Sequence, residues 1–447
     1  MDIAPGTLEN AGPFACAWRR FKALHGKFIS IVVDFARQAM KLGRDDPRRI
    51  IHSLKVGLAI TVVSLFYYFD GLYGGFGVNA MWAVITVVVV FDFSVGATLG
   101  RGLNRAFATL FAGALGVGVH RLANYTGHKC EAILLGFFGF IVAAVVTFLR
   151  FIPKLKARYD YGLLIFILTF CLISVSGYRD DEVLEMARQR LFTILIGGAT
   201  AVIICISICP VWAGDNLSNL VAGNLEKLAS FLVGFEAEYF TNSGDGENKD
   251  SKSSLQGYRS VLNSKGTEES LANFAKWEPC RGWLRTFKYR HPWKQYLNIG
   301  ALARQCAYRT DALHNLLNAG VLTPLEIRVK VQESCGKMSS ESSNALKELA
   351  TAIRAMSPPS TADSHIAKSK IAANNIKSLL KTGLWEDNDL LEIIPTATVA
   401  STFVDIVDCI EKIAQSVHEL ASLHVSFRSA DVAVCPKQSQ LIQNEIL

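Results

Sequence analysis

Two long apolar runs and the charged segment between them limit what this chain can fold into more than any other feature. Between Tyr161 and Gly214 the sequence reads YGLLIFILTFCLISVSGY, then RDDEVLEMARQR, then LFTILIGGATAVIICISICPVWAG. Each run is long enough to cross a bilayer, since a membrane helix needs about 20 apolar residues. An arginine near the middle of such a helix costs about 3 kcal/mol. Arg179, Arg188 and Arg190, at the membrane boundary, therefore predict a functional role for positive charge.

The composition indicates two kinds of domain in one chain. Of the 447 residues, 50% are hydrophobic and 19% charged, with a mean hydropathy of +0.26. With this composition, the chain is too apolar for a typical soluble protein and too polar for one that lies wholly in a membrane. The first twenty residues contain no apolar core followed by a small-residue cleavage site, so we expect no signal peptide and a cytosolic N-terminus.

The fold class predicted is all-α: an integral membrane protein with six transmembrane helices followed by a cytosolic helical domain. We expect the spans at about 50–69, 78–93, a stretch ending near 119, 132–149, and the two runs described above. The predicted domains are a cytosolic segment 1–48, a pore domain 49–214 and a cytosolic helical domain 215–447, with a disordered linker near 241–256.

Helical spacing also appears outside the expected spans. Residues 27–41 are spaced as an amphipathic helix that can lie flat on the cytosolic face. The second half shows helical spacing, including a helix at about 388–424, but no strand alternation and few long apolar runs. We therefore expect no second membrane unit there.

The charges of the short loops predict the orientation. The loop after the second span contains Arg101 and Arg105, and the loop after the fourth contains Arg150, Lys154, Lys156 and Arg158. The loops after the first and fifth spans are acidic or mixed. Because basic loops stay on the cytosolic side, we expect a multi-pass protein whose two termini are both cytosolic.

Positive charge exceeds negative charge at the ends of the expected spans. The cations at or within span ends are Lys55, Arg105, Arg150, Arg179 and Arg190. A travelling anion can supply the missing counter-charge, as in pores lined by Arg or Lys, and a guanidinium binds a carboxylate through two parallel hydrogen bonds. Interfacial anchoring and contact with lipid phosphate are the alternative, and Lys55 can instead extend to the interface.

Acidic residues gather on the expected outer face. Asp181 and Glu185 are four residues apart, hence on one face of a helix, and Asp70 is expected on the same side of the membrane. Hard polyvalent cations prefer such oxygen ligands. The alternative is a solvated acidic loop that pairs with Arg179 and Arg188.

The sequence gives no support for an enzyme or a nucleic-acid-binding protein. It contains no GxxxxGK[ST], HExxH, GxSxG or CxxC motif, so we expect neither catalysis nor a primary pump driven by ATP. The ten cysteines predict buried reduced thiols rather than disulfides or a metal site. The net charge of +7 comes from basic residues beside apolar segments, which is typical of membrane topology.

Several long motifs carry a family resemblance. They are DPRRIIHSLKVGLA, NAMWAVITVVVVFDFSVGATLGRGLNRA, RFIPKLKARYDYG, PVWAGDNL, WEP at Trp277 to Pro279, HPWKQY and ARQCAYRTDAL. In these segments, from about residue 46 to 425, the chain resembles the plant aluminium-activated malate transporter family. The resemblance implies a homodimeric anion channel that passes malate and other anions passively across the plasma membrane, with lipid around it and no cofactor other than extracellular Al³⁺ as an activator.

The resemblance also implies roles for individual residues. The family's basic pore positions match Lys55, Arg105, Arg150, Arg179 and Arg190, and its aluminium-sensing carboxylates match Asp181, Glu185 and Asp70. Some members do not respond to aluminium, and others lie in the vacuolar membrane. A coupled organic-acid exporter and a membrane-tethered scaffold are the other function classes left open.

Overall fold

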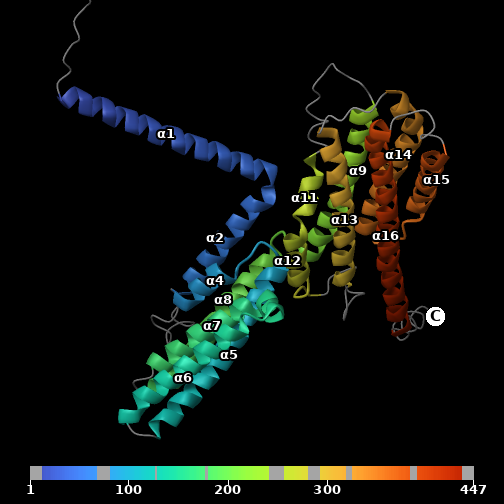
Figure 1. The fold of residues 1–447 in the computed structure, drawn as a ribbon. Helices are drawn as coiled ribbons and strands as arrows, with labels where there is room; N and C mark the ends of the chain where they lie inside the picture. Colours follow the sequence, from blue (N-terminus) through green and yellow to red (C-terminus); the bar gives the residue numbers. More distant parts are fainter. Residues whose placement is uncertain are drawn as a thin grey trace, which may run out of the picture. The chain divides into compact units, whose positions relative to one another are not determined.

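Every regular element in the described part of the chain is a helix (Figure 1). The computed structural model describes residues 13–67, 81–125, 128–176, 180–240, 256–279, 292–318, 325–382 and 390–434. The helices are α1 Pro13–Asp45, α2 Pro47–Tyr67, α4 Met81–Val90, α5 Val95–Asn124, α6 His128–Leu149, α7 Pro153–Ser176, α8 Asp180–Ser207, α9 Ala213–Phe240, α11 Tyr258–Leu262, α12 Lys265–Ala275, α13 Trp293–Asn318, α14 Leu325–Ala355, α15 Ser360–Thr382 and α16 Leu390–Val434. The all-α class is confirmed for these residues. The predicted linker lies outside them, apart from residue 256.

The helices form two compact units. The N-terminal unit comprises Met1–Phe93 and Phe192–Cys209, and the main unit comprises Ser94–Leu191 and Pro210–Leu447. Helix α8 therefore begins in the main unit and ends in the N-terminal unit. The division into membrane and cytosolic domains at residue 214 stays a prediction.

In the N-terminal unit, the sequence DDPRR separates α1 from α2. The Asp46 carboxylate accepts a hydrogen bond from the backbone N–H of Arg48 at 3.2 Å, which is the role of an N-cap residue. Pro47 is the first residue of α2, a position where the missing N–H costs nothing. The helix expected over 27–41 is part of α1, where Phe28 and Phe35 are exposed.

Helices α4 and α8 approach closely in the same unit. A Cβ atom added to Gly197 would lie 2.5 Å from the carbonyl oxygen of Ala83. No side chain fits in that space, so a glycine at this position lets the two backbones touch.

In the main unit, α5 packs along α7. Ser94 caps the start of α5, its hydroxyl accepting a hydrogen bond from the N–H of Ala97 at 3.3 Å. Further along α5, a Cβ on Gly116 would lie 2.9 Å from the Ile173 side chain of α7. The large aromatic side chains Phe111 and Phe140 are exposed on α5 and α6, which is typical of helices that face lipid.

Helices occupy all six positions predicted for spans. In the described part of the chain, Val95–Ala123, Pro153–Ser174, Ala187–Ser207 and Ile393–Leu423 are long and apolar enough to cross a membrane, whereas Met81–Val90 and Ile133–Leu149 are shorter apolar helices. Candidate spans thus lie at the third, fifth and sixth predicted positions. The second and fourth positions hold the shorter helices. The described residues of α2, at the first position, are not apolar enough over a sufficient length to count as a candidate span.

The fourth candidate lies where the sequence predicted a cytosolic helix. Ile393–Leu423 is part of α16, and its side chains Phe403, Ile406, Ile410 and Ile413 are buried in the core that α16 shares with α9, α13 and α14. A helix that is apolar all round is either a membrane span or the central helix of a bundle. We assign α16 to the bundle. Among the described residues after 214, this is the one helix of such length and apolarity, and it lies where the sequence predicted a helix at about 388–424.

Small polar residues bring the bundle helices close together. The hydroxyl of Ser339 on α14 donates to the carbonyl oxygen of Leu232 on α9 at 2.8 Å, and that of Ser343 donates to Ala229 at 3.0 Å. Aromatic rings fill the core beside this contact, with Phe231 and Phe235 of α9 both fully buried.

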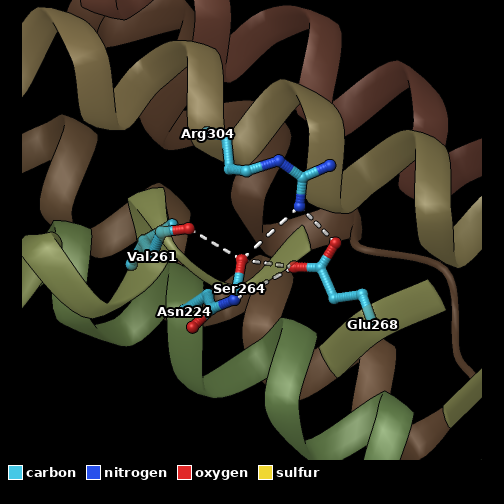
Figure 2. Close-up of polar contacts among 5 residues, drawn as sticks. All are labelled: Asn224, Val261, Ser264, Glu268 and Arg304. Atoms are coloured by element: carbon cyan, nitrogen blue, oxygen red, sulfur yellow. Dashed lines mark hydrogen bonds and ion pairs between the residues drawn. The ribbon is translucent and has the colours of Figure 1, made fainter. Parts of the chain in front are cut away.

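A buried ion pair joins three parts of the bundle (Figure 2). Arg304 of α13 pairs with Glu268 of α12, whose side chain is 0% exposed. The other carboxylate oxygen of Glu268 lies 2.7 Å from the Ser264 hydroxyl and accepts from the side-chain amide of Asn224 at 3.3 Å. Buried charges are tolerated when they are paired and hydrogen-bonded in this way.

Candidate functional site

Two arginines from different helices are buried in the main unit. Arg105 on α5 is 3% exposed, and Arg190 on α8 is 6% exposed. Their guanidinium groups are near enough for mutual electrostatic repulsion. Two like charges held together out of water are costly unless another group offsets their repulsion.

Arg105 has a neutral partner rather than an acidic one. Its terminal nitrogen donates to the hydroxyl of Tyr161 on α7 at 3.0 Å. Its Nε is buried with no hydrogen-bond partner among the described residues, and it forms no ion pair with any of the carboxylates that the structure describes. The Nε–H of Arg105 is therefore a buried donor on a cation, a group that forms strong hydrogen bonds with anionic acceptors.

Lys55 is also buried, in the N-terminal unit. It is 3% exposed, and its Nζ donates to the carbonyl oxygen of Cys209 at 2.8 Å, just beyond the end of α8. A cation at a helix C-terminus satisfies carbonyl groups and the helix dipole. This contact gives Lys55 a local structural role. Its role as a pore-lining residue stays a prediction.

Arg150 finds its counter-charge within the chain. Its Nε donates to Asp160 at 2.7 Å, and a terminal nitrogen donates to the other carboxylate oxygen at 3.3 Å. This two-bond pair joins the end of α6 to the first turns of α7. Arg150 therefore needs no external anion, and its predicted lining role is untested.

The structure describes only some of the predicted acidic residues and of the arginines beside them. Arg179 and Asp70 lie outside the described residues, and so does the side chain of Asp181, although its backbone belongs to α8. Glu185 accepts hydrogen bonds from Arg188 at 2.8 Å and from Gln189 at 2.9 Å. Arg188 lowers the pKa of Glu185 below its ordinary value. This pairing is the one that the solvated-loop alternative predicts for Arg188.

No group of three or more His, Cys, Asp or Glu side chains suited to a metal ion occurs among the residues with described positions. Glu185 is thus the one predicted metal-sensing carboxylate whose surroundings can be assessed, and its nearest partners are a cation and an amide.

The segment Trp277 to Pro279 joins helices that are far apart in sequence. The Glu278 carboxylate accepts hydrogen bonds from the backbone N–H groups of Ala213 and Gly214, the first residues of α9, and from Gly96 in α5. Burial raises the pKa of Glu278 to about 7, although the three N–H groups favour the charged form. Glu278 therefore caps α9 from a distance and ties it to α5.

Sequence reasoning missed the partners of these cations. The sequence analysis gave no role to Tyr161 or Asp160, yet Tyr161 contacts Arg105 and Asp160 contacts Arg150. Their position in the sequence was the available signal. Polar groups at the start of one span lie at the same depth in the membrane as cations at the ends of neighbouring spans.

Comparison with known proteins gives one consistent result. Residues 40–385 match the family model described as aluminium activated malate transporter. The chain is 52% identical to aluminum-activated malate transporter 2 of Arabidopsis thaliana over 394 residues, 88% of this chain and 78% of that protein. It is 48% identical to aluminum-activated malate transporter 7 of the same plant over 420 residues, 88% and 82% of the two chains. It is 45% identical to aluminum-activated malate transporter 1 of Triticum aestivum over 398 residues, 87% and 85%.

Proposed function

Because this chain belongs to the aluminium-activated malate transporter family, we propose that it is an anion channel that conducts malate passively across the plasma membrane. The relatives named above carry malate transport in their names. The absence of a phosphate-binding loop from the sequence fits a channel better than an ATP-driven pump.

The buried pair Arg105 and Arg190 is the observation that carries this proposal. Both side chains are almost fully buried, both lie in apolar helices, and the charge of Arg105 acts on Arg190. A dicarboxylate that passes between them would relieve the repulsion and accept paired N–H bonds from each guanidinium.

We further propose the six-span topology with both termini in the cytosol. The positions of α2, α4, α5, α6, α7 and α8 support it, together with the basic loops after the second and fourth of these helices. The α9–α16 part of the main unit would then be cytosolic. A homodimer is part of the proposal, on the strength of the family resemblance.

The test is two-electrode voltage clamp of oocytes injected with malate. Arg105→Gln and Arg190→Gln should each cut the malate current strongly, because each removes a buried charge without removing the side chain's bulk. Arg121→Gln, which changes an exposed arginine of α5, is the matched control and should conduct normally. Full currents in both buried variants, with normal surface expression, would refute the lining role.

A coupled organic-acid exporter is the second candidate. Such a protein needs a titratable group within a span, and His120, 3% exposed in α5, is one. In a passive channel, the reversal potential follows the malate gradient at any pH, and His120→Gln leaves it unchanged. A reversal potential that follows the proton gradient would favour the exporter.

We also propose that extracellular Al³⁺ activates the channel through Asp181, Glu185 and Asp70. Replacing Asp181 by Asn and Glu185 by Gln together should abolish activation by Al³⁺ and spare the basal current. A trivalent cation binds negatively charged carboxylate oxygens, which both substitutions remove. An unchanged Al³⁺ dose–response would contradict this role, and Glu185 would then have only its contacts with Arg188 and Gln189.

A further inference from the structure

A cavity of about 220 Å³ opens between the first turns of α5 and α7 and the segment at the end of α12. None of the predicted pore-lining residues lines it. The side chains that matter for its chemistry are Arg101, Asn104, Lys156, Arg158, Asn273 and Trp277.

The cavity has an excess of positive charge. Arg101, Lys156 and Arg158 line it together with a single carboxylate, that of Asp160, which already holds Arg150 at 2.7 Å. Lys276 lies beside the cavity, where it donates to the side chain of Asn273 at 3.0 Å.

The surroundings of Lys276 confirm how crowded the cations are. Partial burial lowers the pKa of Lys276, and the neighbouring cations Arg158 and Lys294 lower it further. An anion bound in the cavity would offset this repulsion.

The guanidinium of Arg158 lies over two aromatic rings. Its guanidinium lies 4.8 Å from the centre of the Trp277 ring and 5.4 Å from that of Tyr159, within the range of cation–π contacts. Its backbone carbonyl accepts from the Asn104 side chain at 3.0 Å. Trp277 is held in turn by Gly100, where an added Cβ would lie 2.9 Å from the ring.

A guanidinium that is stacked on aromatic rings and flanked by lysine and amide donors suits a tetrahedral oxyanion. Arginine binds phosphate through its planar fork, and lysine adds a point charge. The cavity volume is below the roughly 300 Å³ typical of the smallest sites for drug-sized ligands. It therefore fits a phosphate group with part of the polyol that carries it, rather than a larger molecule.

The location indicates where such a ligand comes from. The cavity lies at the start of Val95–Ala123 and Pro153–Ser174, two of the helices long and apolar enough to span a membrane. The ends of spans lie at the depth of lipid headgroups, and basic pockets there bind phosphorylated headgroups. We propose that this cavity is a binding site for a phosphomonoester, supplied by the headgroup of a phosphorylated membrane lipid or by a free phosphate ester.

A bound phosphomonoester would strengthen the contact between α12 and the membrane helices. Asn273 lies in the last turn of α12 and Trp277 just after it, whereas Arg101 belongs to α5 and Arg158 to α7. The same segment carries Glu278, which holds the start of α9. Occupancy of the cavity is therefore expected to raise the thermal stability of the main unit.

The experiment measures binding to the full-length protein in detergent, without any current. The probes are dioctanoyl phosphatidylinositol bisphosphate, inositol trisphosphate, inorganic phosphate, dioctanoyl phosphatidylcholine and malate, each followed by thermal shift and thermophoresis. Lys156→Gln leaves the Trp277 contact of Arg158 intact and should weaken binding about tenfold or more, since a charge-assisted bond is lost. Arg158→Gln should do the same, and Arg121→Gln, on the exposed side of α5, should bind as wild type.

The outcomes separate the two sources. Binding of the bisphosphate lipid alone identifies a lipid headgroup, and equal binding of inositol trisphosphate identifies a free phosphate ester; both support the site. Three results overturn it: no binding of either probe, binding that Lys156→Gln and Arg158→Gln leave unchanged, or malate binding as tight as that of the phosphate esters. Loss of malate current in Arg105→Gln would not affect any of these measurements, so the site and the channel proposal can fail separately.

Discussion

Glu278 makes the stability of this protein depend on pH in an unusual direction. Its carboxylate is half-buried and accepts backbone N–H groups from Ala213, Gly214 and Gly96. Burial nevertheless dominates and raises its pKa from 4.5 to about 7. A raised pKa means that the folded chain binds this proton more tightly than the unfolded chain does.

The size and sign of the effect follow from those values. The protonated Glu278 side chain contributes to the free energy of unfolding. This contribution is fully present below pH 4.5 and is lost as the pH rises through about 7. At 1.36 kcal/mol for each pKa unit, the loss is about 3 kcal/mol. Gln carries no charge at any pH and retains one acceptor oxygen. Relative to wild type, the free energy of unfolding of Glu278→Gln should therefore gain about 3 kcal/mol between acidic and alkaline pH, equivalent to about 3–4 °C in Tm for a chain of 447 residues.

The assay is thermal unfolding of the detergent-solubilised full-length protein from about pH 5 to pH 8, which brackets the pKa of Glu278. The matched control is Glu226→Gln, because Arg354 lowers the pKa of Glu226. The stability that Glu226 contributes is lost as the pH falls, so its variant should differ from wild type most at high pH, with a lower Tm. Parallel Tm curves for wild type and Glu278→Gln would refute the reasoning.

Two further predictions concern packing. Arg304→Met leaves the fully buried carboxylate of Glu268 without its cation and should lower the free energy of unfolding by about 3–5 kcal/mol. Lys337→Met, which removes an exposed ion pair, should lower it by under about 1 kcal/mol. Equal losses of Tm in the two variants would contradict the buried network. Gly197→Ala places a Cβ 2.5 Å from a carbonyl of α4 and should lower the Tm and the yield of folded protein. Gly198→Ala meets nothing within 4 Å and should be neutral, so equal tolerance of the two substitutions would contradict the close approach.

Apolar patterning predicted the helices well but not their surroundings. The six helices from α2 to α8 lie where apolar runs predicted spans, because the length of a run shows directly in the sequence. Apolar length alone would also make α16 a span, but its long apolar run is covered by α13, α14 and α15. Lipid and a protein core both favour apolar side chains, so the contacts of a helix, rather than its sequence, distinguish a membrane span from a core helix.

The candidate site was predictable by charge but not by pairing. Arg105 and Arg190 stood out because cations within apolar runs are costly, and both are buried. The sequence did not reveal that Arg150 pairs with Asp160, since that contact depends on the break between α6 and α7. Nor did it reveal the Glu278 contacts, which join residues more than 60 positions apart.

The central claim is that Arg105 and Arg190 line the path of the anion. The most direct measurement is modification of Arg105→Cys and Arg190→Cys channels by a negatively charged methanethiosulfonate reagent during voltage clamp, with Arg121→Cys and wild type as controls. Our account predicts that the reagent reduces the malate current of both buried variants and that malate slows the reaction. Currents that the reagent leaves unchanged, or a reaction rate that malate does not affect, would contradict it.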